Sequence, residues 1–182
     1  MSVKIAVSGT HCSGKSTLIA DFLEVNPAFI HEPEPYEWLQ EMYGETFSDR
    51  PTADDFYRQL EVCVERLHSH ESNADVIAER SPVDFVAYLL ALGDLGHESF
   101  ALDDAIALAR RGTARLDCIA FLPMAKGIVA PESEDLALRE STNDRLIELF
   151  ADDEFDLLGN RVRVVEIRGT PAQRLRALQA CI

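Results

Sequence analysis

The sequence contains no long hydrophobic run and only four cysteines. No stretch approaches the roughly 20 apolar residues that a helix needs to span a bilayer. The apolar N-terminal segment is short and leads directly into a glycine-rich stretch, so we expect a strand there, and neither a signal peptide nor contact with a membrane. The cysteines (Cys12, Cys63, Cys118 and Cys181) form no C-x-x-C pair, which argues against a zinc site or a disulfide framework. Reduced thiols in a cytoplasmic protein are the simplest interpretation.

Basic residues are scarce as well. The chain has 17 Lys and Arg against 32 Asp and Glu, which gives a formal net charge of −15. A surface with this charge repels a polyanion, so we expect no nucleic-acid partner. The phosphates of a small nucleotide need only a local positive site, and several of the few basic residues should gather around it. We regard a homodimer as a possible assembly.

Short apolar segments alternate with helical patterns along all 182 residues. We predict strands at residues 3–8, 28–31, 76–78, 116–122 and 161–167, and helices at residues 15–25, 51–72, 100–111 and 136–150, with two more that begin near residues 82 and 171. This alternation predicts an α/β fold with a parallel sheet between layers of helices, and we treat residues 1–182 as one domain. In such sheets the ligand binds at the carboxyl ends of the strands.

Local signals refine these boundaries. Thr52, Ser81 and Thr170 stand where helix N-caps are expected, and Gly112 stands where a helix should end. The two prolines within residues 32–35 should break any regular structure after the second strand, because each restricts its predecessor to an extended conformation.

Residues 9–16, GTHCSGKS, fit the phosphate-binding pattern G-x-x-x-x-G-K-[ST] without a gap. The glycines let the backbone curl so that successive N–H groups can face phosphate oxygens, and the following helix adds its positive end. Lys15 should face the β- and γ-phosphates of ATP, exposed to the ligand and not packed in the core, and Ser16 should bind Mg²⁺. The residues expected to bind ATP in this loop are Gly9, Thr10, His11, Cys12, Ser13, Gly14, Lys15, Ser16 and Thr17. His11 and Cys12 fill variable positions and receive no catalytic role.

An acid and an arginine follow the third predicted strand. Glu79 would stand close to the γ-phosphate, where it could hold Mg²⁺ through water or take a proton from an acceptor. Arg80 could neutralise the charge that develops on the transferred group. The alternative is an ion pair between these two residues at a strand end.

The second predicted strand is followed by the acidic segment EPEPYEW, residues 32–38. A carboxylate here could activate a substrate hydroxyl, and Tyr36 or Trp38 could stack on a flat ring. The alternative is an acidic turn with aromatic residues of the core. The sequence does not choose between Glu32 and Glu34, and the base could also be Glu79.

Two further segments place arginines at the same edge of the sheet. Arg139 and Arg145 lie in or beside the helix after the fourth strand, where a mobile segment could swing them onto phosphates; we favour Arg139 as catalytic and ATP-binding, with ion pairs to nearby acids as the alternative. After the last strand, Thr170 could contact the adenine through its backbone and Arg174 could stack on the base. Simple helix capping is the alternative there.

These segments occur in the order found in P-loop nucleoside and nucleotide kinases. The residues that carry the resemblance are GTHCSGKST, EPEP, ERSPVDFVAYL and EIRGTPAQRLRAL. The Glu79-Arg80-Ser81 triplet resembles that of deoxynucleoside kinases, and the E-P element before Trp38 resembles theirs too, in which the glutamate, here Glu34, is the general base. The later part of the chain is similar to small bacterial AAA-domain ATPase-like proteins related to the ribosylnicotinamide kinase domain.

The resemblance implies a P-loop NTPase three-layer sandwich with five parallel strands in the order 2-3-1-4-5 and a short lid at about residues 124–145. It also implies phosphoryl transfer from ATP, with Mg²⁺, to a small metabolite that carries a hydroxyl or phosphate group, such as a nucleoside or nucleotide. The alternative is an ATPase or nucleotide-binding regulator without such an acceptor. A GTPase is disfavoured because the Asn-Lys-x-Asp motif is absent.

Overall fold

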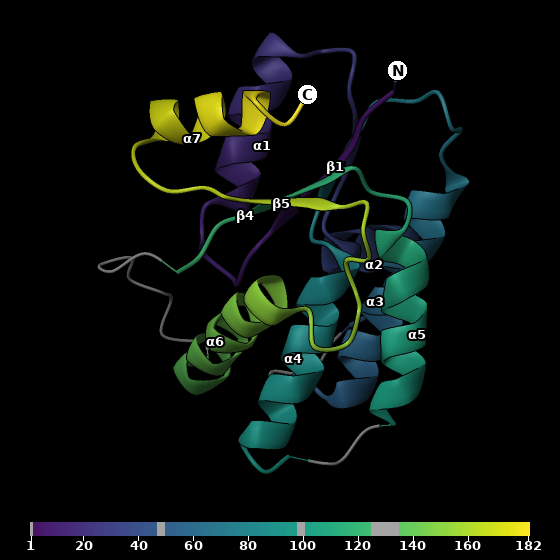
Figure 1. Ribbon diagram of the computed structural model, residues 1–182. Coiled ribbons are helices and arrows are strands. Elements are labelled where there is room, and N and C mark those ends of the chain that lie inside the picture. The colour runs from purple at the N-terminus through teal and green to yellow at the C-terminus, as the bar shows by residue number, and fades with distance from the viewer. Residues whose placement is uncertain (1, 47–49, 98–100, 125–134) are drawn as a thin grey trace.

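Five parallel strands form one central sheet in the computed structural model, which describes residues 2–46, 50–97, 101–124 and 135–182 (Figure 1). The strands are β1 (Lys4–Ser8), β2 (Ile30–Glu32), β3 (Val76–Glu79), β4 (Cys118–Phe121) and β5 (Arg163–Glu166). Their order is β2-β3-β1-β4-β5, and each neighbouring pair is parallel. The predicted strand order is therefore confirmed.

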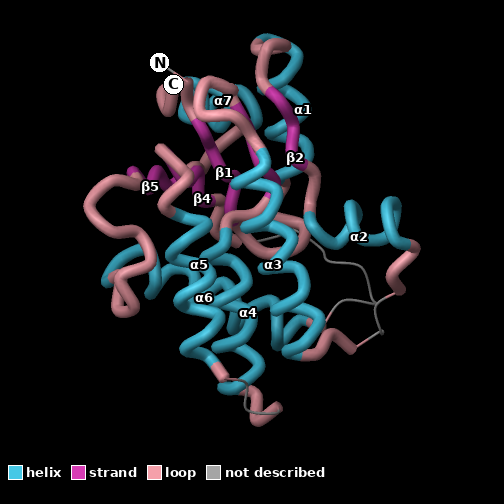
Figure 2. Tube along the Cα trace, turned by 90° about the vertical axis from the view of Figure 1, so that its right-hand side faces the viewer, coloured by secondary structure: helices cyan, strands magenta, loops and turns pink. Residues whose placement is uncertain are grey.

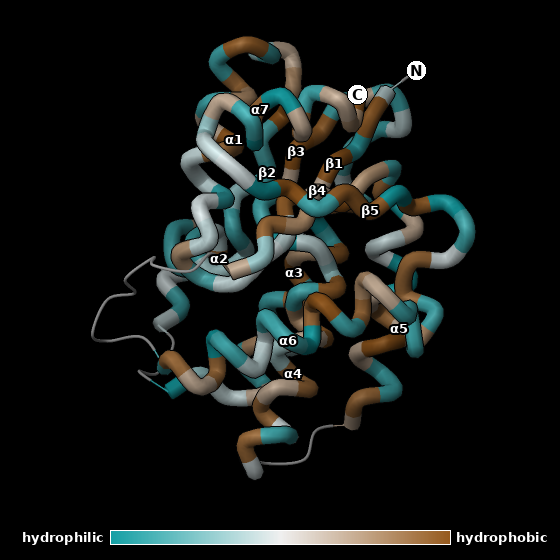
Figure 3. The backbone as a smooth tube through the Cα atoms, turned by 60° about the vertical axis from the view of Figure 1, so that its left-hand side comes forward, coloured by the Kyte–Doolittle hydropathy of each residue, from teal (hydrophilic) through white to brown (hydrophobic). Residues whose placement is uncertain are grey.

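Alternate residues of the strands face two hydrophobic clusters on opposite sides of the sheet. On β1, Ile5 and Val7 belong to one cluster and Ala6 to the other, as the two-residue period of a strand requires. Helices α1 (Lys15–Val25) and α7 (Pro171–Gln179) cover the first side. The second side is covered by α3 (Ala53–Ser69), α4 (Pro82–Asp94), α5 (Leu102–Thr113) and α6 (Leu136–Asp152). Figures 1 and 2 show these two layers, and the hydropathy colouring of Figure 3 shows β1 and β3 as mainly apolar strands between them.

One helix was not predicted. Helix α2 (Pro35–Tyr43) begins inside the segment that we expected to be irregular. Pro35 occupies the first position of this helix, where its missing N–H costs nothing and its fixed φ angle fits the helical backbone. The proline therefore starts regular structure where we predicted that it would break it.

Gly112 also has a different role from the predicted one. Helix α5 continues through it to Thr113, so it does not end the helix. A Cβ atom at this position would lie 2.6 Å from a side-chain carbon of Val64 on α3 and 2.8 Å from one of Pro82 on α4. The glycine allows three helices to approach closely, which is a requirement of packing and not of backbone conformation.

The predicted caps are confirmed, and the predicted lid is only partly covered by the described residues. Thr52, Ser81 and Thr170 each form a capping box with the residue three positions later. Residues 136–145 form the first part of α6, whose Leu138 and Leu146 pack in the core beside α4. The segment 125–134 lies outside the described residues, so a lid there remains a prediction.

Candidate nucleotide and phosphoryl-transfer site

The phosphate loop connects the buried end of β1 to the first turn of α1, as the motif requires. Gly9 and Gly14 have φ angles of +148° and +92°, which residues with a Cβ rarely adopt. A Cβ atom on Gly9 would lie 2.5 Å from the carbonyl oxygen of Leu122, just after β4. The glycines thus let the loop curl tightly against the carboxyl edge of the sheet.

Four carbonyl oxygens of this loop accept hydrogen bonds from cationic side chains. The donor–acceptor pairs are Arg80 Nη1 to Gly9 O (2.7 Å), Lys15 Nζ to Thr10 O (3.1 Å), Arg139 Nε to His11 O (2.9 Å) and Arg174 Nη1 to Ser13 O (3.1 Å). The C=O and N–H of one planar peptide point in opposite directions. Cations that hold these carbonyls therefore constrain the orientation of the peptide planes of the loop, and with it the direction of the N–H groups that could face a phosphate.

Lys15, Ser16 and Glu79 form a compact polar group at the start of α1. The Ser16 hydroxyl donates to Glu79 Oε1 at 2.9 Å, and Lys15 Nζ lies 3.9 Å from the same oxygen. Lys15 is only 4% exposed, so the expectation of an exposed side chain is wrong, although Lys15 belongs to neither hydrophobic cluster. Burial, followed by the positive charge of Arg80, lowers the pKa of Lys15 to about 8. Burial also raises the pKa of Glu79, against the opposing charge of Lys15.

Arg80 joins the loop to Glu34. Its Nε donates to Glu34 Oε1 at 2.6 Å, and its guanidinium lies over the ring of Tyr88, 5.3 Å from the centroid. The residue is 1% exposed and has a φ angle of +80°, which is unusual for arginine and marks a strained position. Burial would raise the pKa of Glu34, but the charges of Arg80 and Lys15 outweigh it and bring this pKa to about 2. The alternative ion pair between Glu79 and Arg80 is replaced by the pair of Arg80 with Glu34.

The structure also separates the two carboxylates of the EPEP segment. Glu32 accepts two hydrogen bonds from Arg66, both 2.7 Å long, and a third from His70 Nε2 at 2.6 Å. These partners lie at the carboxyl-terminal end of α3 and just beyond it, whereas Glu34 contacts the arginine that holds Gly9. Of the two, Glu34 is the carboxylate beside the phosphate loop.

The remaining predicted residues differ in how close they lie to the loop. Arg139 is buried against the loop, whereas Arg145 forms ion pairs with Asp94 and Glu148 on the outer surface of α6. Thr170 caps α7, and Arg174 contacts the loop through Ser13. The predicted contacts of Arg139 with phosphate, and of Thr170 and Arg174 with adenine, remain predictions.

Within the loop, Cys12 and Thr17 are exposed. The His11 ring lies edge-on to Tyr88, with centroids 6.4 Å apart. Loss of hydration, followed by the positive charge of Arg80, lowers the pKa of His11 to about 4, so this ring is neutral near pH 7.

Three residues at the site were not predicted from the sequence. The hydroxyl of Tyr88 on α4 accepts a hydrogen bond from Arg80. Its ring stacks on Phe56 of α3, with ring centroids 4.3 Å apart. Asp84 is fully buried and binds the N–H of Gly9. Its capping position was visible in the sequence, but its contact with the loop was not.

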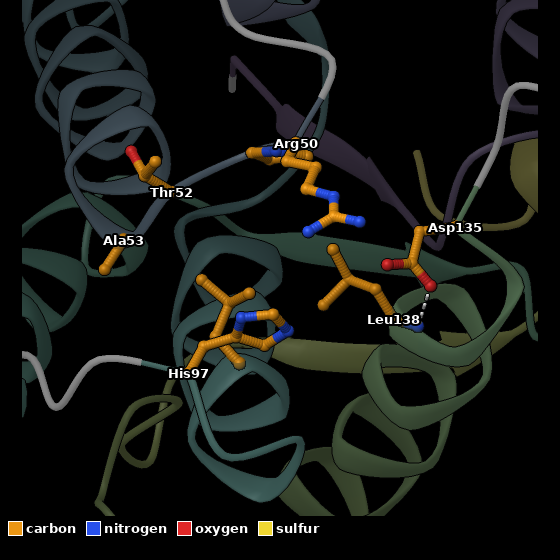
Figure 4. A pocket seen from close by; sticks show the side chains of 8 residues that line it. Arg50, Thr52, Ala53, His97, Asp135 and Leu138 are labelled. Carbon is orange, nitrogen blue, oxygen red and sulfur yellow. Dashed lines mark hydrogen bonds between the residues drawn. The ribbon is translucent and has the colours of Figure 1, made fainter.

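A cavity of about 480 Å³ lies one helical turn beyond the stacked pair of Phe56 and Tyr88. It is lined by Arg50, Pro51, Thr52, Ala53, Leu92, His97, Asp135 and Leu138. Ala53 precedes Phe56 by one turn on α3, and Leu92 follows Tyr88 by one turn on α4, so each pair shares a helix face. Figure 4 shows the side chains of Arg50, His97 and Leu138 pointing toward one another across this hollow.

Comparisons with solved structures show the same fold. A NadR protein in complex with NAD and AMP-PNP superposes with a TM-score of 0.69 at 20% identity, covering 98% of this chain and 49% of that chain. A deoxyadenosine kinase from M. mycoides with bound dATP gives a TM-score of 0.68 at 16% identity, with 98% and 97% covered. A thymidylate kinase from Candida albicans gives 0.63 at 17% identity, with 98% and 90% covered. The chain thus spans about half the length of the NadR structure that it matches.

These likenesses confirm the predicted resemblance to P-loop nucleoside and nucleotide kinases at the level of the fold. No curated protein matches the sequence. Among the described residues, no helix combines the length and the apolar character that crossing a membrane would take. The family described as an AAA domain matches residues 4–174. Since this match spans nearly the entire chain and includes the phosphate loop and all five strands, the protein belongs to that AAA domain family.

Proposed function

We propose that this protein is an ATP-dependent kinase that transfers a phosphoryl group to a hydroxyl or phosphate group of a small metabolite, of the nucleoside or nucleotide class. The observation that carries the proposal is a single polar cluster at the carboxyl edge of the sheet. This cluster contains the phosphate loop with Lys15 and Ser16, and the buried Arg80. It also contains two carboxylates, Glu34 and Glu79, whose pKa values are shifted in opposite directions. Phosphoryl transfer depends mainly on positioning and charge stabilisation, and these groups are suited to both.

The donor half of the proposal rests on the loop and the first turn of α1. The loop N–H groups and Lys15 would hold the phosphates of ATP. Ser16 Oγ and Glu79 Oε1 lie 2.9 Å apart, and hydroxyl and carboxylate oxygens are the ligands that Mg²⁺ prefers, so they fit a magnesium ion held directly or through water. The bound ion would neutralise charge on the phosphates. Glu79 must then be ionised, and the ion's charge would offset the effect of burial on its pKa.

The acceptor half rests on Glu34 and its neighbours. Glu34 is ionised near neutral pH because of Arg80, and it can accept a hydrogen bond from an acceptor hydroxyl and orient it toward the γ-phosphate. A carboxylate with a pKa of about 2 is a weak base. We therefore assign Glu34 two tasks: it orients the acceptor hydroxyl, and it accepts the hydroxyl proton late in the phosphoryl transfer. Tyr88 contacts Arg80, the partner of Glu34, and stacks on Phe56, and the cavity one helical turn farther along α3 and α4 could take the distal part of the acceptor.

The test is whether ADP formation by the purified protein depends on an added acceptor. The protein would be incubated with ATP and Mg²⁺ and a panel of nucleosides and nucleotides, and ADP and the phosphorylated product would be measured together. A kinase gives stoichiometric ADP and phosphorylated product with one class of acceptor, and Lys15→Ala gives neither. ADP formation that is equal with and without every acceptor would instead support the ATPase alternative, and a wild-type protein that binds no ATP would contradict both.

A further inference from the structure

The carboxylate of Asp84, in the first turn of α4, is fully buried and accepts four hydrogen bonds. Its Oδ1 accepts the N–H of Gly9 at 2.9 Å. Its Oδ2 accepts the hydroxyl of Ser8 at 2.5 Å and both the hydroxyl and the N–H of Ser81, at 2.7 and 2.9 Å. A buried carboxylate is costly unless donors of this kind surround it. Asp84 therefore ties the end of β1 and the start of the phosphate loop to the first turn of α4.

Both polar groups of the Gly9 backbone are held by the segment that runs from the end of β3 into the first turn of α4. Asp84 accepts its N–H, and Arg80 donates to its C=O at 2.7 Å. The two peptide planes that flank Gly9 are thus fixed in orientation, with a φ angle of +148°, although a glycine, which has no Cβ atom, could adopt many other conformations. Arg80 Nη1 also lies 3.7 Å from Asp84 Oδ1, and its Nε binds Glu34. One hydrogen-bond network therefore connects the start of the phosphate loop to Glu34, the carboxylate proposed to orient the acceptor.

A second capping box in the chain shows what this motif does without a phosphate loop beside it. At the start of α3, Asp55 Oδ2 accepts the N–H of Thr52 at 2.7 Å and its hydroxyl at 2.8 Å. These bonds are exposed to solvent and local to the helix end. Capping therefore accounts for the bonds between Asp84 and Ser81, but it does not account for the bonds to Ser8 and Gly9, which lie more than seventy positions earlier in the chain.

We propose that Asp84 is a positioning residue for nucleotide binding: it sets the orientation of the Gly9 peptide groups, and through them the conformation of the phosphate loop. Asp84 does not itself touch the nucleotide. Its effect is to pre-organise the loop, so that the N–H groups facing the phosphates need no rearrangement when ATP binds. The inference rests on the nucleotide-binding half of the proposed function and is independent of the acceptor.

The experiment compares Asp84→Asn with the matched change Asp55→Asn. An asparagine cannot accept all four bonds, because its NH₂ group is a donor, so the start of the loop loses its anchor. We expect Asp84→Asn to raise the Kd for ADP with Mg²⁺ at least about tenfold, measured by calorimetry well below the melting temperature. Asp55→Asn should lower the melting temperature through the lost cap but leave the Kd within about twofold of the wild-type value.

A folded Asp84→Asn protein with the wild-type Kd would overturn the inference. If that variant does not fold, Ser8→Ala and Ser81→Ala provide the same comparison with smaller changes, because each removes one hydroxyl from Oδ2. Ser8→Ala, at the loop side, should raise the Kd at least about threefold, whereas Ser81→Ala, at the helix side, should not. Equal Kd values for these two variants would also overturn it. A wild-type protein that binds ADP but never phosphorylates an acceptor would contradict the proposed kinase activity alone, and one that binds no nucleotide would contradict both.

Discussion

Glu34, largely buried, and Glu79, buried, are two carboxylates at the same edge of the sheet, and their surroundings shift their pKa values in opposite directions. Burial raises both values. At Glu34 the charges of Arg80 and Lys15 outweigh burial and bring the pKa to about 2. At Glu79 burial prevails over the charge of Lys15 and the hydrogen bond from Ser16, and the pKa is raised. The difference lies in the nearest cation: a guanidinium nitrogen 2.6 Å from Glu34, against an ammonium nitrogen 3.9 Å from Glu79.

This difference separates the tasks that the two groups can perform. Glu34 is held as an anion and in place, which suits orientation of a hydroxyl group. Burial works against the charged form of Glu79, which suits a group whose charge a metal ion or a proton will neutralise. It also separates their effects on stability, since the negative charge of Glu34 stabilises the fold and that of Glu79 opposes it. The same substitution of glutamate by glutamine should therefore have opposite effects on stability at the two positions.

The largest expected effect is that of Glu79→Gln on the chemical step. Both candidate roles, metal binding and proton acceptance, need the charge that this variant lacks, so the single-turnover rate should fall by roughly 10²–10⁴-fold. The Kd for ATP should change far less, because the loop and Lys15 remain. The melting temperature should hold or rise, because a costly buried charge is gone. Unchanged phosphoryl transfer would remove Glu79 from the site, and a lower melting temperature with normal turnover would make its role structural.

Glu34→Gln should mainly cost stability. It leaves the 1% exposed Arg80 without the charge of its closest carboxylate, and breaking a buried ion pair from one side typically costs about 3–5 kcal/mol. Urea unfolding should show this loss, and turnover by the protein that remains folded should fall as well. A variant as stable as the wild type would show that the pair with Arg80 is not the reason for the low pKa.

Glu32→Gln is the matched control for Glu34→Gln. Glu32 also binds an arginine, Arg66, but this pair lies away from the phosphate loop. The control should lose stability while turnover per folded molecule stays near the wild-type value. Equal losses of turnover in the two variants would contradict the assignment of Glu34, rather than Glu32, to the acceptor side.

The dependence of the unfolding free energy on pH, below pH 4.5, should distinguish Glu34 from Glu79. The pKa of Glu34 is about 2 in the fold against 4.5 ordinarily, so its contribution is fully present above pH 4.5 and is lost as the pH falls through 2. The full loss would be about 3 kcal/mol. Glu79, with its raised pKa, acts with the opposite sign and favours the fold as the pH falls toward 4.5. Unfolding free energies at a series of pH values should decline less steeply below pH 4.5 in Glu34→Gln than in the wild type.

The sequence was sufficient to predict those parts of the site that depend on local pattern or on the rule for parallel sheets. The phosphate loop is contiguous, so Lys15 and Ser16 could be placed directly. Glu79 could be placed near Ser16 because β1 and β3 end at the same edge, and the register confirms this by pairing Val7 with Glu79. The capping boxes were visible for the same reason, since each lies within four residues.

The parts that could not be predicted depend on contacts between distant elements. Nothing in EPEP distinguishes its two glutamates, because the distinction comes from Arg66 on α3 and Arg80 after β3. Gly112 looked like a helix end, because a close approach of three helices leaves no local signal. The contact of Asp84 with Gly9 was not predicted, because the capping motif at the start of α4 already accounted for an acid at this position.

The smallest expected effect concerns the proton balance of Lys15, whose ammonium group is attracted by both carboxylates. Burial lowers its pKa to about 8, so between about pH 8 and 10 much of Lys15 is neutral. Phosphates beside it would favour the charged form, and ATP binding should then take up a proton, up to about one per site. Calorimetry at pH 9 in buffers with different ionisation enthalpies measures this number as the slope of the binding enthalpy against the ionisation enthalpy of the buffer.

Lys4 is the control, because it is also buried and its pKa is also lowered, but it lies at the opposite end of β1. Lys4→Met should leave the slope unchanged, and a slope of zero in the wild type would show that the protonation of Lys15 does not change when ATP binds.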